Sequence, residues 1–150
     1  TVTDRFVEPY MFLNNDRDIR CHEICCHQNK TFKLSRMEKV ELMDMPWTNK
    51  AQHKQLYTDI FMFSGEERYH VRLLLGQLSH NIMVEEYPLS KPSITLASDG
   101  IHWILDIEVA SFMGIGRFVM GLYDDIKVLG DEQFKTYINE KVALIKKSIQ

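Results

Sequence analysis

Residues 93–110, SITLASDGIHWILDIEVA, decide how the second half of this chain folds. Two apolar segments flank Ser98-Asp99-Gly100 in this stretch. An Asp-Gly pair between apolar segments is one of the strongest short-range signals of a β-hairpin. The stretch therefore predicts two antiparallel strands joined by a tight turn.

The hairpin lies within a longer alternation of predicted strands and helices. Residues 69–75 alternate apolar and polar side chains as a strand does. Residues 77–87 have the apolar spacing of a helix, which ends before Pro88. The remaining predicted elements are a helix at 111–124, a strand at 125–131 and a helix at 132–149. The last helix has an apolar stripe made of Phe134, Ile138, Val142 and Ile145. The order β-α-β-β-α-β followed by a helix is the split βαβ, ferredoxin-like arrangement.

The first 62 residues are rich in strand signals. Residues 4–13 are predicted to be extended, because Pro9 lacks a backbone donor and disfavours a helix. A second strand is predicted at 19–26, between turn clusters at 14–18 and 27–30.

The rest of the first part is less regular. Residues 31–45 alternate at Phe32-Leu34 and again at Val40-Leu42, which predicts further strand-like pieces. A polar connection with a short helix is predicted after residue 45. The sequence thus predicts an α+β chain with a strand-rich part and linker at 1–62 and a ferredoxin-like part at 63–150.

Length and composition are typical of a folded, water-soluble protein. The chain has 150 residues, of which 45% are hydrophobic and 26% charged, and a net charge of −3. Such a chain can bury a core without disulfides or metals, and its charge gives no general attraction to nucleic acid or acidic lipid. No apolar run reaches the ~20 residues of a membrane helix, and no signal-peptide pattern is present. We expect a cytoplasmic protein that does not contact a membrane.

All three cysteines lie within residues 21–27, CHEICCH, which raises the question of a metal site. On the predicted strand, Cys21 and Cys25 share a face but lie about 13 Å apart, and Cys25 and Cys26 point to opposite faces. Zinc needs its ligands at ~2.0–2.3 Å, so we expect no metal site and no cofactor. The thiols are expected to pack as small apolar groups, with His22 and His27 on the surface. A helix would instead bring the cysteines one turn apart, so metal binding through Cys21, Cys25 and Cys26 is an alternative.

Catalytic and nucleotide-loop motifs are absent from the sequence. The glycines at 114, 116 and 121 do not form a dinucleotide fingerprint, because the sixth position is Val119. A P-loop, a nucleophile elbow and a metalloprotease helix are also absent. We expect a protein that is not an enzyme.

Residues 5–37 contain a set of spaced motifs, made of Arg5, Glu8, Pro9, Phe32, Lys33, Leu34, Arg36 and Met37. This set resembles the WYL domain of bacterial transcription regulators. That family has an Arg-x-x-x-Pro strand, a strand that carries Trp-Tyr-Leu, and a closing strand of the form fRldRi. The part from about residue 69 resembles the C-terminal extension of WYL domains. Its matches are Asp99-Gly100, Ile104, Val109, Phe118, Met120-Gly121, Ile126 and Val128-Leu129.

Two features depart from the family pattern. The position of the Trp-Tyr-Leu motif is occupied by Ile19-Arg20-Cys21. The chain also starts at the strand before Pro9, so we expect a fragment that lacks the first barrel strands and the DNA-binding helix-turn-helix domain.

The resemblance implies the effector-sensing and oligomerisation region of a bacterial WYL-type regulator. The first part would be a partial SH3- or Sm-like β-barrel, and the chain would form a homo-oligomer. The effector would be a nucleotide or single-stranded nucleic acid, and DNA would bind through the helix-turn-helix domain. Guanidinium groups suit phosphate oxygens, and the expected ligand-binding residues are Arg5, Arg20, Lys33 and Arg36. The alternative for these residues is a solvated strand face, since residues 1–36 carry six basic and five acidic side chains.

Other interpretations remain open at this point. The chain could be a ligand-independent dimerisation and assembly module, because open strand edges favour pairing with another chain. Arg117 either faces the effector or is solvated. The aromatic residues of the connecting region either stack on bases or hold that region on its domain. These residues are Trp47, Tyr57, Phe61 and Phe63.

Overall fold

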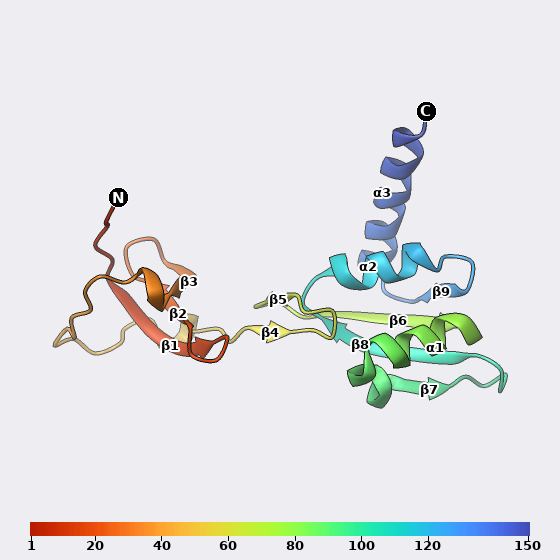
Figure 1. Cartoon of the computed structure of the whole chain (residues 1–150), viewed down its shortest axis with the longest axis horizontal. Helices are drawn as coiled ribbons and strands as arrows, with labels where there is room; N and C mark the ends of the chain where they lie inside the picture. The colour runs from red at the N-terminus through yellow and green to blue at the C-terminus, as the bar shows by residue number, and fades with distance from the viewer. The chain divides into compact units, whose positions relative to one another are not determined.

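The computed structural model describes residues 1–150, and its internal contacts divide the chain into two compact units. Unit 1 is Thr1–Gln55 and unit 2 is Leu56–Gln150. Both contain antiparallel sheets, and the helices lie mainly in unit 2, so the chain is α+β (Figure 1). Residues just after the boundary pack on unit 2, where the Tyr57 hydroxyl donates to the Glu108 carbonyl at 3.0 Å.

Unit 1 is built on a three-stranded antiparallel meander in the order β1-β2-β3. Its strands are β1 (Val7–Leu13), β2 (Asp18–Glu23) and β3 (Gln28–Lys33). The β1–β2 turn contains Asn14, Asn15 and Asp16, all at positive φ, a conformation that Asn and Asp adopt more readily than other side chains do. Two short 3₁₀ helices follow, η1 (Leu34–Arg36) and η2 (Lys50–Gln52).

The meander corrects three expectations from the sequence. The second strand ends at Glu23, so Cys25 and Cys26 lie in the β2–β3 turn and not on the strand. The turn lies at residues 24–27, three positions earlier than the expected 27–30, because residues 28–30 belong to β3 and pair with β2. Val40 and Leu42 lie in no strand and are exposed, since alternation without a neighbouring strand does not form a sheet.

Unit 2 has a four-stranded antiparallel sheet in the order β7-β8-β6-β9. The sheet strands are β6 (Tyr69–Leu75), β7 (Ile94–Leu96), β8 (Trp103–Val109) and β9 (Ile126–Leu129). The helices are α1 (Gln77–Glu86), η3 (Pro88–Ser93), α2 (Phe112–Gly121) and α3 (Glu132–Ser148). A small ribbon of β4 (Tyr57–Thr58) and β5 (Ser64–Gly65) precedes them. The predicted order of strands and helices in this half is confirmed.

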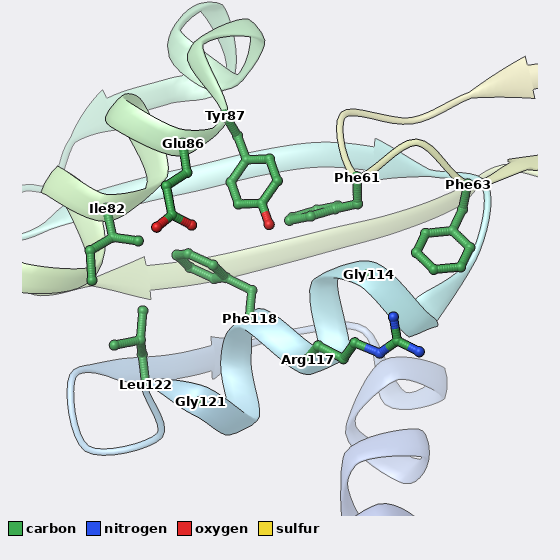
Figure 2. Close-up of a pocket in the computed structure, with 10 residues that line it drawn as sticks. All are labelled: Phe61, Phe63, Ile82, Glu86, Tyr87, Gly114, Arg117, Phe118, Gly121 and Leu122. Atoms are coloured by element: carbon green, nitrogen blue, oxygen red, sulfur yellow. The ribbon is translucent and has the colours of Figure 1, made fainter.

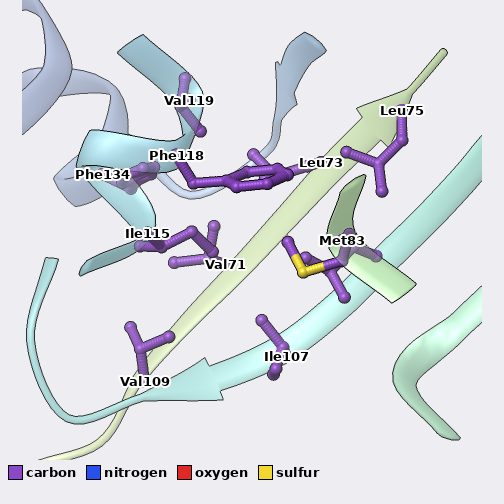
Figure 3. Packing of buried hydrophobic residues seen from close by; sticks show 11 residues of the cluster. Val71, Leu73, Leu75, Met83, Ile107, Val109, Ile115, Phe118, Val119 and Phe134 are labelled. Carbon is purple, nitrogen blue, oxygen red and sulfur yellow. The ribbon is translucent and has the colours of Figure 1, made fainter. Parts of the chain in front are cut away.

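The core of unit 2 lies on one face of its sheet. Alternate residues Val71, Leu73 and Leu75 of β6 are buried, and so are Ile107 and Leu105 of β8, which pair with the first two. Met83 from α1 and Ile115 from α2 pack against this same cluster (Figure 3), so both helices cover one face. The period of two along the strands decides which face is buried.

Local signals fix where the helices begin. The Ser111 hydroxyl accepts from the Met113 N–H at the start of α2, and the Asp131 carboxylate accepts from Gln133 at the start of α3. Both are N-caps that satisfy otherwise unpaired backbone donors. Asp125, from the α2–β9 loop, accepts from the Ser79 N–H at 2.6 Å and so binds α1 to that loop.

Helix α3 is packed only along its first turns. Phe134 is fully buried and Ile138 packs against the core. Val142 and Ile145 continue the predicted apolar stripe but are half exposed. Figure 1 shows this end of α3 extending away from α2 and the sheet.

Candidate functional site

An aromatic cavity lies in unit 2 between α1, α2 and the loop that connects β4 to β5. Its volume is about 370 Å³. Figure 2 shows Phe61 and Phe63 coming from the loop, Tyr87 from the end of α1 and Phe118 from α2. Ile82, Glu86, Gly114, Arg117, Gly121 and Leu122 complete the lining. We call this space the aromatic cavity.

The loop that forms one wall is held by the buried carboxylate of Asp59. One carboxylate oxygen accepts from the Phe61 N–H at 2.9 Å and the Phe63 N–H at 3.1 Å. The other accepts from the Ala110 N–H at 3.0 Å, just before α2. Asp59 therefore joins the wall of the cavity to the end of β8, and its position was not suggested by any sequence motif.

A glycine allows the loop to approach α2 closely. A Cβ atom at Gly114 would lie 2.3 Å from Cβ of Phe61, which is closer than any normal contact. The Phe61 ring in turn lies 4.6 Å from the Tyr87 ring and 6.4 Å from the Phe118 ring, between centroids. These tilted contacts are within the favourable range for aromatic pairs, so the wall is preformed.

Two charged side chains line the aromatic cavity, and they lie at different ends. Figure 2 shows Glu86 beside Ile82, and Arg117 beside Phe63. The Arg117 guanidinium lies 5.8 Å from the centroid of the Phe63 ring. Both charged groups are exposed to solvent. The cavity thus offers aromatic walls for a flat apolar group and a guanidinium for an anion.

A second cavity, of about 580 Å³, lies in unit 1 where β2 begins and β3 ends. We call it the strand-end cavity. Its lining residues are Asn14, Arg17, Asp18, Lys33, Leu34 and Ser35. Of the four expected ligand-binding residues, Lys33 lines this cavity and none lines the aromatic cavity.

The other expected ligand-binding residues are dispersed. Arg5 pairs with Glu23 at 2.5 Å, and Arg20 donates to the Thr31 hydroxyl at 3.0 Å. Arg36 ends η1 and is exposed. In the β2–β3 register, Arg20 and Lys33 belong to one face of the meander, whereas Glu23, the partner of Arg5, belongs to the other. The four residues therefore do not form one patch.

Unit 1 also buries a polar cluster that the sequence did not predict. The Glu8 carboxylate accepts from the Thr48 and Asn49 N–H groups at 2.6 and 3.1 Å and lies 3.4 Å from His53 Nε2. Burial alone would raise the pKa of Glu8, but these hydrogen bonds, from Asn49 first, hold it below its ordinary value. The Tyr10 ring stacks on His53 at 4.7 Å.

His22 lies on the same face of the meander as Glu8. It is buried, which corrects the expectation that it is a surface residue. Its Nδ1 lies 2.8 Å from the Asn29 side-chain oxygen, whereas its Nε2 has no hydrogen-bond partner. His27 is exposed, as expected. Pairing with β1 and the covering segment 47–53 explain the burial of His22, and neither is visible as a local sequence signal.

No known protein-family model matches the chain, and no curated protein sequence matches it either. Among its helices, none combines the length and the apolar character needed to cross a membrane.

Proposed function

We propose that this chain is the effector-sensing region of a bacterial transcription regulator of the WYL type, and that the aromatic cavity binds the effector. The observation that carries the proposal is the coincidence of aromatic walls and one guanidinium in a preformed cavity. Small-molecule sites typically have such a mostly apolar lining with few polar groups. The regulator assignment rests on the order of the WYL-like motifs in residues 5–37.

The cavity favours a nucleotide as the class of effector. Its volume lies at the lower end of the usual ~300–1,000 Å³ for ligand sites, which suits one base and its sugar. Phe61 and Tyr87 provide surfaces on which a base can stack. Arg117 would bind the phosphate by charge-assisted hydrogen bonds. Glu86 would repel a phosphate at its own end, so it favours the orientation with the phosphate beside Arg117.

The topology of each unit supports a finer assignment of the fold. In unit 2, each helix crossover joins two strands separated by a third, and both helices cover one face. A ferredoxin-like domain has this order of strands and helices, which supports that assignment. In unit 1, the meander β1-β2-β3 is the kind of piece from which a small SH3- or Sm-like barrel is built. We therefore propose a partial barrel followed by a ferredoxin-like domain.

The proposed mechanism is a shift between two geometries of an oligomer. An effector changes the geometry only if it binds one arrangement more tightly than the other. In the proposed regulator, that difference would reposition helix-turn-helix domains on DNA. Typical coupling free energies of ~1–3 kcal/mol would change DNA affinity about 5- to 150-fold.

The first experiment is a titration of the ¹⁵N-labelled full chain with AMP, GMP, CMP and UMP. Changes in NMR chemical shifts report the binding. We expect at least one nucleotide to shift resonances of the loop 61–63 and of α2. Arg117→Ala should weaken that binding about tenfold, since a charge-assisted hydrogen bond is lost. Gly121→Leu should also weaken it, because Gly121 lines the cavity and a Cβ there meets nothing within 4 Å, so a larger side chain can take up space that the ligand needs.

Matched variants separate the two cavities. Gly121→Ala is the control for Gly121→Leu, and Lys33→Ala and Arg36→Ala test the basic residues of unit 1. If only Lys33→Ala and Arg36→Ala weaken nucleotide binding, the effector binds on the meander. That result would overturn the aromatic cavity as the effector site. No binding of any nucleotide by the folded chain would reject the proposal.

The exposed end of α3 favours a second candidate, ligand-independent self-assembly. Val142 and Ile145 are each 50% exposed and continue a stripe whose first member, Phe134, is buried and whose second, Ile138, is partly buried. A second copy of the chain could cover them by antiparallel helix packing. Light scattering tests this: a dimer that nucleotides do not affect and that Ile145→Lys splits would favour assembly, whereas a monomer would exclude it.

A further inference from the structure

The β2–β3 turn of unit 1 brings two exposed thiols together. Cys25 and Cys26 lie in the turn, with their sulfur atoms 3.1 Å apart. The expectation that they point to opposite faces applied to a strand, and β2 ends before them at Glu23. The reason for excluding a shared ion at these two sulfurs is therefore removed.

A carboxylate completes a set of three donor atoms. One oxygen of Glu23 and the two sulfurs all lie within 4.8 Å of one another. The Glu23 side chain is only 2% exposed and is oriented by ion pairs with Arg5 and Lys30.

We propose that Cys25, Cys26 and Glu23 bind one thiophilic divalent cation of the zinc and cadmium class. As the ion binds, each thiol releases its proton to solvent and each sulfur forms a bond to the metal, so two protons leave for one divalent ion. The two thiolates and the carboxylate fill three positions of a tetrahedral site, and water takes the fourth.

The required movement is small. In a tetrahedral site with metal–sulfur bonds of ~2.3 Å, the sulfurs lie about 3.8 Å apart, so the two side chains open by under an ångström. Both cysteines are exposed and in a turn, where such a change meets no packed neighbour. Lys30 is 36% exposed and can move from Glu23 into solvent as the cation replaces its charge.

Cys21 provides an internal control. It is buried in β2, and burial raises the pKa of its thiol to about 11. It is thus neither accessible nor readily ionised, and the three-cysteine site considered from the sequence does not form. Any metal binding that needs Cys21 would contradict the proposal.

The experiment is a titration of the full chain, purified without a metal-affinity tag and kept reduced, with Cd²⁺. Thiolate-to-cadmium charge-transfer absorption reports sulfur coordination directly, and Zn²⁺ competition reports the affinity for zinc. We expect one Cd²⁺ per chain with two thiolate ligands. Cys25→Ser and Cys26→Ser should each weaken binding more than tenfold, and Cys21→Ala should leave it unchanged.

Two further variants test the carboxylate. Glu23→Gln should weaken binding about tenfold, whereas Lys30→Ala, which breaks the same ion pair but keeps all three ligands, should not weaken it. Circular dichroism confirms that each variant is folded. Absence of a charge-transfer band, one ion per two chains, or equal losses in Glu23→Gln and Lys30→Ala would overturn the three-ligand site.

Discussion

Glu8 shows how a single buried carboxylate organises unit 1. It accepts hydrogen bonds from Thr48 and Asn49, which are about forty positions away in the chain, and so holds segment 47–53 on the meander. We predict that Glu8→Gln lowers the free energy of unfolding of unit 1 by about 2 kcal/mol, because hydrogen bonds to a charged acceptor are lost. Urea unfolding followed by Trp47 fluorescence, in a Trp103→Phe background, measures this change.

The same carboxylate makes stability depend on pH. The pKa of Glu8 in the folded protein is below its ordinary value of 4.5. The contribution of this carboxylate to stability is therefore fully present above pH 4.5 and is lost as the pH falls through the folded pKa. The wild type should therefore lose stability below about pH 4.5 more steeply than Glu8→Gln does. The control is Glu41→Gln, whose side chain is exposed. Equal acid sensitivity of the wild type and Glu8→Gln would contradict the prediction.

Asp59 has the corresponding role in unit 2. Its carboxylate accepts three backbone N–H groups, two from the loop that walls the aromatic cavity and one from Ala110. We predict that Asp59→Ala destabilises unit 2 by about 2–3 kcal/mol. The same change should weaken the binding of any ligand in the aromatic cavity, since the loop that forms its wall is released. Thermal unfolding and the nucleotide titration measure the two effects. Asp124→Ala, an exposed carboxylate, is the control and should change neither.

Sequence reasoning identified charges at the residue scale but not their partners. Arg5, Arg20, Lys33 and Arg36 were named because their side chains suit phosphate, yet only Arg20 and Lys33 share a face of the meander. Arg5 pairs with Glu23, which belongs to the other face. Glu8 was named only as a match to the WYL pattern and Asp59 was not named at all, because the partners of both carboxylates are distant backbone groups. A buried acidic residue has no local signature when its donors come from elsewhere in the chain.

At the scale of elements, two of the three glycines of α2, Gly114 and Gly121, have opposite surroundings. A Cβ at Gly114 would overlap Phe61, whereas a Cβ at Gly121 meets nothing within 4 Å. We predict that Gly114→Ala costs 1–3 kcal/mol, as overpacking typically does, and displaces the cavity wall. Gly121→Ala should be neutral or slightly stabilising, because Ala favours the helix over Gly. Thermal unfolding compares the pair, and equal losses would contradict the close approach.

Elements with a complete local signal were predicted correctly. The Asp-Gly hairpin at β7–β8 is confirmed: the Asp99 carboxylate accepts from the Ile101 and His102 N–H groups, and Gly100 has φ of +73°. The strand at 19–26 was extended too far, because Cys25 and Cys26 suit a strand by composition and only pairing with β3 fixes the turn. Where a strand ends depends on its neighbour, which local sequence does not encode.

At the scale of the whole molecule, the chain has two units, and each contains one tryptophan. Trp47 lies in unit 1, in edge contact with His53, and Trp103 lies on β8 of unit 2, stacked on His80. The large buried apolar cluster is confined to unit 2, whereas unit 1 buries Cys21, His22, Glu8 and Glu23. Because apolar burial supplies most of the folding free energy, unit 1 should be the less stable of the two.

A substitution at Phe134 tests whether the two units unfold separately. Phe134 is fully buried and anchors α3 against Phe112, at 5.2 Å between ring centroids. We predict that Phe134→Ala lowers the stability of unit 2 by about 3–5 kcal/mol, as loss of a buried aromatic ring does. The Trp103 transition in urea should move to lower concentration, while the Trp47 transition should stay in place. Coincident shifts of both transitions would mean that the units unfold as one cooperative body, and the stability of unit 1 would then have to come from unit 2.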